Sequence, residues 1–407
     1  MKVGWDITKL GDVSQIINGG TPKSKVKNYW NGNINWITPA DLGKIKSLLV
    51  DETPRKITEL GLQKSSAKLF PAKSVILSTR APIGHLAINT VPMATNQGCR
   101  GIVPNENLDT FFLYYFLKGN IELLNDLGTG TTFLELSTKN LSSVQIPLPP
   151  LPEQKRVVSI LDRAFAAIDK AKANAKKNLQ NAIELFESYL QGVFENQGEG
   201  WEEKKLGDVC QFENGDRGKN YPNKSHRVPE GIPFINAGHL ANNEIDFSRM
   251  DYISEERFNL LGNGKVKQND ILFCLRGSLG KVANVGKLEK GAIASSLVIL
   301  RAKEEINNDF LLYFLNSDLT INQIFDFGNG AAQPNLSAGS LKKFIIPLPR
   351  SKEEQLSIVQ QLASVKEQTQ RLETLYQKKI AALDELKKSI LQKAFQGELE
   401  TEKEFAL

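Results

Sequence analysis

The feature that most constrains this chain is a proline-rich stretch followed by a long stretch without proline. Residues 146–154 read IPLPPLPEQ, with four prolines in six residues. Proline fixes φ and lacks an amide hydrogen, so we expect this segment to be extended, unable to continue a sheet or to start a helix early. From Glu153 to Glu195 no proline occurs, and the first glycine is Gly192. This predicts one helix of about 43 residues, roughly 64 Å long.

The predicted helix carries a heptad seam, with Asn178 at one core position. The other seam residues are Val157, Leu161, Ala164, Ile168, Ala171, Ala175, Ala182, Leu185 and Tyr189. The motif recurs 200 residues later as IPLP at 346–349 and EQ at 354–355. A second seam follows at Ile358, Leu362, Val365, Thr369, Leu372, Tyr376, Leu383, Leu386 and Ile390. Two rods that each have one narrow seam should pack together, more simply antiparallel than parallel.

The sequence before each long helix is also repeated. The pattern WxxxKLGDV opens at Trp5 and at Trp201. Strand-like residues 74–77 precede Arg80, and 270–273 precede Arg276. Further matching pairs are the helix-like residues 112–117 and 310–315, and the glycine-flanked turns 128–130 and 328–330. The repeat predicts two mixed α/β globules of about 150 residues each.

The expected fold class is therefore α/β (α+β), with two mixed domains joined by two long helices in an antiparallel coiled coil with pseudo-twofold symmetry. The expected boundaries are 1–150 for the first globule, 151–197 for the central helix, 198–350 for the second globule, 351–398 for the second helix, and 399–407 for a tail. The second junction has lost two prolines, so we expect it to be looser.

Composition excludes some classes of protein. No run of eighteen apolar residues occurs and the N-terminus has no apolar signal core, so we expect a cytoplasmic protein. Three widely spaced cysteines and three scattered histidines favour reduced thiols and argue against a zinc site. Residues 1–150 carry 16 Lys and Arg against 11 Asp and Glu, a net charge of +5, whereas residues 198–351 carry 19 against 19. This balance permits a polyanionic partner without requiring one.

The WxxxKLGD opening, the IPLPPLPEQ exit and the internal repeat resemble the specificity subunit of Type I restriction–modification enzymes (the HsdS family), over essentially the whole chain. The resemblance implies a DNA-binding subunit in which each globule is a target-recognition domain for one half of a split DNA site. It also implies that the helices set the spacer and dock two adenine-methylating subunits, through which restriction subunits join. S-adenosylmethionine, ATP and Mg would then be bound by the partner subunits, with no cofactor and no metal on this chain.

Residues that read bases should lie where the two globules differ, and shared residues should serve the fold, phosphate contact or docking. The candidates combine cations for phosphates with amides and aromatic groups for bases. They are Lys23, Lys25, Lys27, Asn28, Tyr29, Asn31, Arg80, Asn96 and Gln97 in the first globule, and Arg217, Lys219, Asn220, Tyr221, Lys224, His239, Arg276 and Ser295 in the second. Asp41 and Ser296 are further divergent positions. Arg80 and Arg276 could equally tie a turn to a carboxylate.

Catalysis by this chain is not expected. An adenine methyltransferase would need a glycine-rich cofactor loop and an Asp/Asn-Pro-Pro-Tyr/Phe tetrapeptide, and neither occurs. The sequence GSLGK at 277–281 has the wrong spacing for a phosphate-binding loop. The alternative to a DNA reader is a coiled-coil scaffold with two ligand-binding globules that are not specific for DNA.

Overall fold

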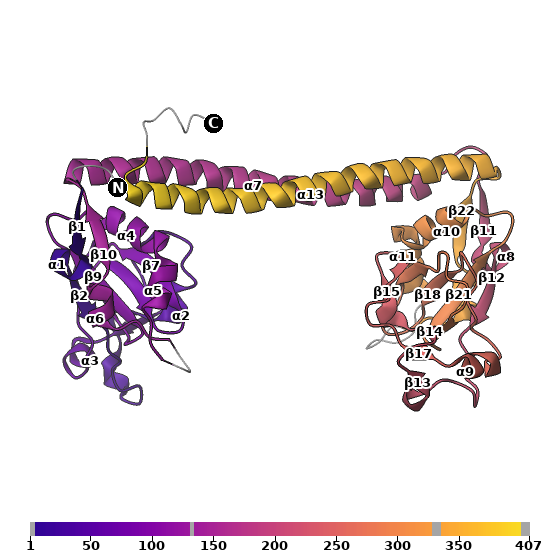
Figure 1. Cartoon of the computed structure of the whole chain (residues 1–407), viewed down its shortest axis with the longest axis horizontal. Coiled ribbons are helices and arrows are strands. Elements are labelled where there is room, and N and C mark those ends of the chain that lie inside the picture. The colour runs from indigo at the N-terminus through magenta and orange to yellow at the C-terminus, as the bar shows by residue number, and fades with distance from the viewer. Residues whose placement is uncertain (1–4, 131–133, 328–334, 400–407) are drawn as a thin grey trace. The chain divides into compact units, whose positions relative to one another are not determined.

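The computed structural model describes residues 5–130, 134–327 and 335–399. The chain divides into two compact units (Figure 1). Unit 1 comprises Met1–Lys176 with Lys378–Leu407, and unit 2 comprises Lys177–Gln377. Each of the two long helices, α7 (Leu151–Glu195) and α13 (Lys352–Gln396), therefore contributes to both units. In the described part of the chain, no helix combines the length and the apolar character needed to cross a bilayer.

The described residues of unit 1 form sheets with the strand orders β2-β9-β6-β7-β4, β5-β3-β8 and β1-β10. The strands are β1 (Asp6–Lys9), β2 (Ser14–Asn18), β3 (Trp30–Ile37), β4 (Leu49–Val50), β5 (Arg55–Ile57), β6 (Val75–Thr79), β7 (Ile83–Asn89), β8 (Met93–Thr95), β9 (Cys99–Pro104) and β10 (Gln145–Leu148). The helices are α1 (Leu10–Val13), η1 (Lys27–Tyr29), α2 (Pro39–Leu42), α3 (Glu59–Gln63), α4 (Thr110–Gly119), α5 (Ile121–Asp126) and α6 (Thr138–Ser142).

Unit 2 repeats this plan with the orders β12-β21-β18-β19, β13-β17-β14-β20, β11-β22 and β15-β16. The strands are β11 (Glu202–Lys205), β12 (Cys210–Asn214), β13 (Arg227–Val228), β14 (Ile232–Ile235), β15 (Leu240–Ala241), β16 (Glu244–Ile245), β17 (Tyr252–Ile253), β18 (Ile271–Cys274), β19 (Val282–Asn284), β20 (Ala292–Ile293), β21 (Leu297–Ala302) and β22 (Ile345–Leu348). The helices are α8 (Leu206–Val209), η2 (Lys224–His226), η3 (Ala237–His239), α9 (Glu255–Leu260), α10 (Asn308–Leu315), α11 (Asp318–Phe327) and α12 (Ala338–Leu341). The predicted turn at 328–330 lies outside the described residues.

Each unit is built around a helix that is apolar on nearly every side. In unit 1 this is α4, where six consecutive residues from Phe112 to Leu117 are buried. A helix that is hydrophobic all round must be covered on all sides. The cover comes from the sheet, through Val75 among others, and from both long helices, through Leu161 and Ile390. The long helices are thus part of the core of a unit, and the fold class matches the sequence-based prediction.

The prediction that the proline-rich segment cannot join a sheet is wrong. Residues of β10 pair antiparallel with β1, with Pro147 opposite Ile7, and Pro347 of β22 lies opposite Glu203 of β11. In an antiparallel ribbon alternate N–H groups point away from the partner strand, so a residue without an N–H fits there. Helix α7 also begins early, with Pro152 as its second residue. In the first turn a missing N–H removes no intrahelical bond.

A buried glutamine joins each long helix to its globule. The Gln154 side chain is fully buried. Its Oε1 accepts from the amide of Asp109, the N-cap of α4, at 2.8 Å. Its Nε2 donates to the carbonyls of Asn107 and Pro149, both at 2.8 Å. These three bonds fix the start of α7 against the start of α4.

The same junction exists in unit 2, where Gln355 is equally buried. Its Oε1 accepts from the amide of Asn307, the N-cap of α10, at 2.7 Å. Its Nε2 donates to Glu305 O at 3.1 Å and to Pro349 O at 3.0 Å. The loss of two prolines therefore leaves the same three kinds of bond in place, and the looser second junction stays a prediction.

Within each unit the two long helices run antiparallel. In unit 1, Lys172 pairs with Asp384 at 2.5 Å and Lys387 pairs with Asp169 at 2.8 Å. In unit 2 the end of α7 meets the beginning of α13, where the Tyr189 hydroxyl donates to Gln361 Oε1 at 3.2 Å. The antiparallel coiled coil was correctly predicted.

Four seam positions were predicted wrongly. The side chain of Leu185 is 53% exposed, and Phe186 packs against the unit 2 core in its place. Leu372 and Leu386 are also exposed, as is Asn178, which was placed at a core position. An α-helix drifts by about 20° per heptad relative to a strict seven-residue repeat. Four heptads separate Val157 from Leu185, so the drift of about 80° brings the next residue inward.

Candidate nucleic-acid interface

In unit 1, three loops follow strands that end at one edge. Strand β2 ends at Asn18, β6 at Thr79 and β8 at Thr95. The Gly20 amide donates to Thr95 O at 2.8 Å, and the Thr79 amide donates to Gly98 O at 2.8 Å. These bonds hold the three strand-end loops side by side.

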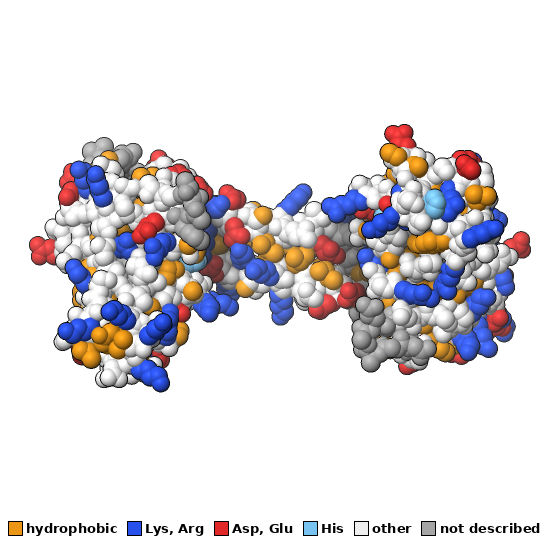
Figure 2. Space-filling view, turned by 90° about the horizontal axis from the view of Figure 1, so that it is seen from below, with side chains coloured by type: hydrophobic (Ala, Val, Ile, Leu, Met, Phe, Trp, Pro, Cys, Tyr) orange, Lys and Arg blue, Asp and Glu red, His pale blue; other side chains and the backbone are white. Residues whose placement is uncertain are grey.

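The loop after β2 presents the lysine-rich candidates on a tethered backbone. Trp30 Nε1 donates to Lys23 O at 3.3 Å, and Thr58 Oγ1 donates to Asn28 O at 2.7 Å. The exposed candidates here are Lys23, Lys25, Lys27, Asn28 and, on β3, Asn31, while Tyr29 is half-buried. Figure 2 shows Lys and Arg side chains distributed over the surface of each unit that faces away from α7 and α13.

The turn after β8 carries the candidates Asn96 and Gln97, and the structure brings it to the lysine loop. The Thr21 hydroxyl donates to Gln97 Oε1 at 2.5 Å. Asn96 is half-buried, with its Oδ1 accepting from the Gly98 amide at 3.0 Å, whereas Gln97 is exposed. Cations and an exposed amide from distant parts of the sequence therefore share one surface.

Unit 2 repeats this edge. Strands β12, β18 and β20 end at Asn214, Cys274 and Ile293. The Leu275 amide donates to Ser296 O at 2.8 Å, the equivalent of the bond between Thr79 and Gly98.

The candidates in the loop after β12 are partly engaged. Exposed side chains are those of Arg217, Lys219 and Lys224, while Asn220, Tyr221 and Ser295 are half-buried. Asn220 Nδ2 donates to Leu260 O at 2.9 Å, and the Tyr221 ring lies 5.8 Å from that of Phe234. The Asp216 carboxylate accepts from the Gly218 amide at 2.6 Å and the Gly262 amide at 2.9 Å. These backbone bonds lower the pKa of Asp216 and tie the loop to the segment after α9.

His239 and Asp41 occupy equivalent capping positions. Asp41 Oδ2 accepts from the amide of Thr38 at 3.1 Å in a capping box at α2. His239 Nδ1 accepts from the amide of Asn236 at 3.2 Å at η3, and its Nε2 lies 3.1 Å from Arg249 O. His239 is 7% exposed. Both ring nitrogens are engaged, so the ring serves the local fold.

Arg80 and Arg276 differ in their surroundings. Arg80 Nη1 lies 3.4 Å from Glu135 Oε2, so Arg80 is tied to a carboxylate. Arg276 is exposed and has no ion-pair partner within the described ranges 5–130, 134–327 and 335–399. The structural interpretation thus fits Arg80, and Arg276 is the accessible cation.

Arg100 was not among the sequence-predicted candidates. It is 8% exposed, and its Nη2 lies 3.6 Å from Glu135 Oε1. Its Nη1 donates to Gln97 O at 2.7 Å. Burial lowers the pKa of the Arg100 guanidinium, and Glu135 opposes this shift. A comparison of the two repeats could have singled Arg100 out, because the equivalent residue in unit 2 is Val298.

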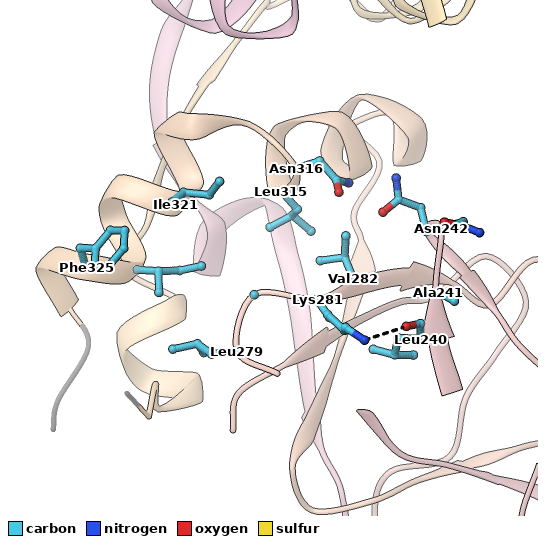
Figure 3. Close-up of a pocket in the computed structure, with 13 residues that line it drawn as sticks. Leu240, Ala241, Asn242, Leu279, Lys281, Val282, Leu315, Asn316, Ile321 and Phe325 are labelled. Carbon is cyan, nitrogen blue, oxygen red and sulfur yellow. Dashed lines mark hydrogen bonds between the residues drawn. The ribbon is translucent and has the colours of Figure 1, made fainter. Parts of the chain in front are cut away.

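Unit 2 also contains an apolar groove of about 1000 Å³ (Figure 3). Its walls include Leu279, Val282, Leu315, Ile321 and the largely exposed Phe325. Among the described residues that line it, the polar side chains are those of Lys281, Asn242, Asn243 and Asn316, and none is a carboxylate, histidine, cysteine or hydroxyl group. Across the described residues, no group of three His, Cys, Asp or Glu side chains could hold a metal ion.

Two copies of one mixed α/β unit, each completed by two long helices, define the fold class of the Type I specificity subunits. The chain matches the family model for the Type I restriction modification DNA specificity domain over residues 2–181 and 198–382. It belongs to this family. It is a non-catalytic specificity subunit of a Type I restriction–modification system.

Individual relatives match over nearly the whole chain. The MjaIX specificity subunit of Methanocaldococcus jannaschii is 29% identical over 98% of this chain and 94% of its own length. Two solved structures share the fold. One comes from work on complex assembly and conformational transition of the type I R-M system, with a TM-score of 0.77 at 22% identity, covering 98% of this chain and 99% of the other. The other is the HsdS subunit from Thermoanaerobacter tengcongensis, with a TM-score of 0.65 at 21% identity and 98% of each chain covered.

Proposed function

We propose that this chain reads a bipartite DNA target, with one half-site for each unit. The observation that carries the proposal is the edge of strand-end loops, which the chain builds twice, with the Thr79–Gly98 backbone bond of unit 1 repeated as Leu275–Ser296 in unit 2. The side chains displayed there differ between the copies, as expected for two unequal half-sites. An asymmetric pair of readers suits a non-palindromic site, just as symmetric dimers suit palindromes.

The candidate side chains divide by chemistry into phosphate and base contacts. Exposed lysines and Arg276 suit phosphates, which position a protein on DNA without reading its sequence. Exposed amides such as Asn28, Asn31 and Gln97 suit base edges, where asparagine and glutamine pair with adenine. His239 is omitted from this assignment because its ring nitrogens are engaged.

In this proposal residues 1–150 and 198–350 are the target-recognition domains. Residues 151–197 and 351–398 form the spacer between half-sites, and 399–407 is a tail whose first residue, Leu399, packs into the unit 1 core. The exposed flanks of the helices dock two methyltransferase subunits, through which restriction subunits join. S-adenosylmethionine, ATP and Mg belong to those partners.

The salt dependence of binding to duplex DNA tests this proposal against the scaffold alternative. Each phosphate contact adds about 0.9 to the slope of log K against log salt. Changing Lys23, Lys25 and Lys27 to glutamine should therefore lower the slope by about 2 to 3. The matched control changes Lys170, Lys176 and Lys177, three exposed lysines of α7, and should leave the slope unchanged. Binding that is absent or independent of salt would favour the scaffold.

A further inference from the structure

One carbonyl oxygen accepts a hydrogen bond from an arginine in both units, but the arginine comes from different elements. In unit 1, Arg100 of β9 donates to Gln97 O at 2.7 Å. In unit 2, Arg217 of the loop after β12 donates to Ser295 O at 3.4 Å. The two acceptors are equivalent, because each lies two residues before the first residue of β9 or β21.

The two arginines differ in accessibility. Arg100 is 8% exposed, and its Nε also donates to Thr138 Oγ1 at 3.4 Å. Arg217 is exposed within a proposed DNA-contacting loop. In unit 1 a buried arginine, Arg100, therefore holds the turn at Gln97. In unit 2 an exposed loop arginine, Arg217, holds the equivalent turn at Ser295.

Arg100 reaches a second candidate through Glu135. The carboxylate of Glu135 lies 3.6 Å from Arg100 Nη2 and 3.4 Å from Arg80 Nη1. Among the described residues of unit 2, no equivalent chain of contacts occurs. Val298 stands in place of Arg100, because it pairs with Asn214 as Arg100 pairs with Asn18. Asn335 stands in place of Glu135, one residue before Leu336, whose amide bonds the strand end as that of Leu136 does.

We propose that Arg100 is a positioning residue for target recognition by unit 1. Through the Gln97 carbonyl it fixes the turn that carries the exposed Gln97 amide, and through Glu135 it fixes the guanidinium of Arg80. It contacts no DNA itself. The inference rests on the proposed function and names a residue that sets the accuracy of one half-site alone.

The proposal predicts a change of specificity without a change of electrostatic affinity. Arg100→Met should lower discrimination against wrong bases in the unit 1 half-site by roughly fivefold to a hundredfold, the range of one base-reading pair. Discrimination in the unit 2 half-site should stay as it is. The salt slope should not change, because no phosphate contact is lost.

The experiment uses the full chain assembled with its methyltransferase subunits. Methylation is measured on a library of sites that carry single substitutions in either half. Arg217→Met is the reciprocal control and should lower discrimination in the unit 2 half-site only. Arg100→Lys keeps the charge, but its ammonium group cannot reproduce the guanidinium geometry, so it should restore discrimination only in part. Glu135→Gln should lower discrimination in the unit 1 half-site to a smaller extent.

The outcomes are distinguishable. If the wild-type complex shows no split target, the proposed function fails. If it shows one and Arg100→Met reads both halves like the wild type, only the inference on Arg100 fails. Equal loss in both halves would also overturn it, because that indicates a general folding defect. If Arg100→Met does not assemble, the Arg100→Lys and Glu135→Gln variants decide by the same criteria.

Discussion

Single residues that lie far from the proposed interface determine how each unit is built. Gln154 and Gln355 occupy the same position in the two copies and make the same three hydrogen bonds. A buried polar group left without a partner costs more free energy than an ordinary hydrogen bond contributes. The pair of glutamines therefore couples the start of each long helix to its globule.

Replacing Gln154 with leucine should loosen that coupling. The Asp109 amide and the carbonyls of Asn107 and Pro149 would lose their partner, at a cost of about 2 kcal/mol or more. Amide hydrogen exchange near the starts of α4 and α7 should then become about thirtyfold faster. The control is Gln180→Leu, an exposed glutamine of α7, which should leave exchange unchanged. Exchange in Gln154→Leu equal to that of the wild type would show that the bonds carry no such stability.

In each long helix, the effect of a substitution on the free energy of unfolding should depend on whether the side chain is buried or exposed. Ala182 is 4% exposed, whereas Leu185, three residues on, is 53% exposed. Side chains inserted into a packed contact force neighbours to move, while exposed positions tolerate change.

We therefore expect Ala182→Leu to lower the free energy of unfolding by about 1 to 3 kcal/mol. Leu185→Ser should change it by less than about 0.5 kcal/mol, because this side chain already faces solvent. Urea unfolding of the full chain, followed by far-ultraviolet circular dichroism, measures both. A larger effect from Leu185→Ser than from Ala182→Leu would contradict the exposed position of Leu185. It would place this side chain in the contact between the two helices, as the strict heptad repeat predicts.

The same seam shows what the sequence could and could not predict. Sequence motifs that occur twice predict the two long helices, their antiparallel packing and the repeated units. Leu185 was misplaced because local spacing does not reveal how far a helix departs from a seven-residue repeat. Pro147 was misjudged because pairing with β1 is a long-range event. Arg100 was missed because the sequence does not show that its acceptor is the Gln97 carbonyl, although the difference from Val298 in the second repeat marks the position.

In the whole molecule, the parts proposed to read DNA bases are separate from the parts proposed to set the distance between half-sites. Each unit holds its own core and its own strand-end loops, and both long helices pass from one unit to the other. In the proposed function the loops specify bases and the helices specify the distance between half-sites. These two properties should therefore change independently.

Inserting one heptad into α7 and one at the matching level of α13 tests that separation. Seven residues add about 10 Å of helix and keep the seam in phase. The spacer of the target should lengthen by about three base pairs, at 3.4 Å each, with both half-sites unchanged. Inserting a heptad into α7 alone is the control and should prevent assembly. An unchanged spacer in an assembled complex would contradict the role of the helices.

A methylation map tests most directly whether each unit reads one half-site. The chain is expressed with its methyltransferase subunits in a host without adenine methylation, and N6-methyladenine is located by sequencing. We expect a split motif with one methylated adenine in each half, and exchange of residues 1–150 for those of a relative should alter one half only. A continuous motif, or an exchange that alters both halves, would contradict the assignment of one half-site to each unit.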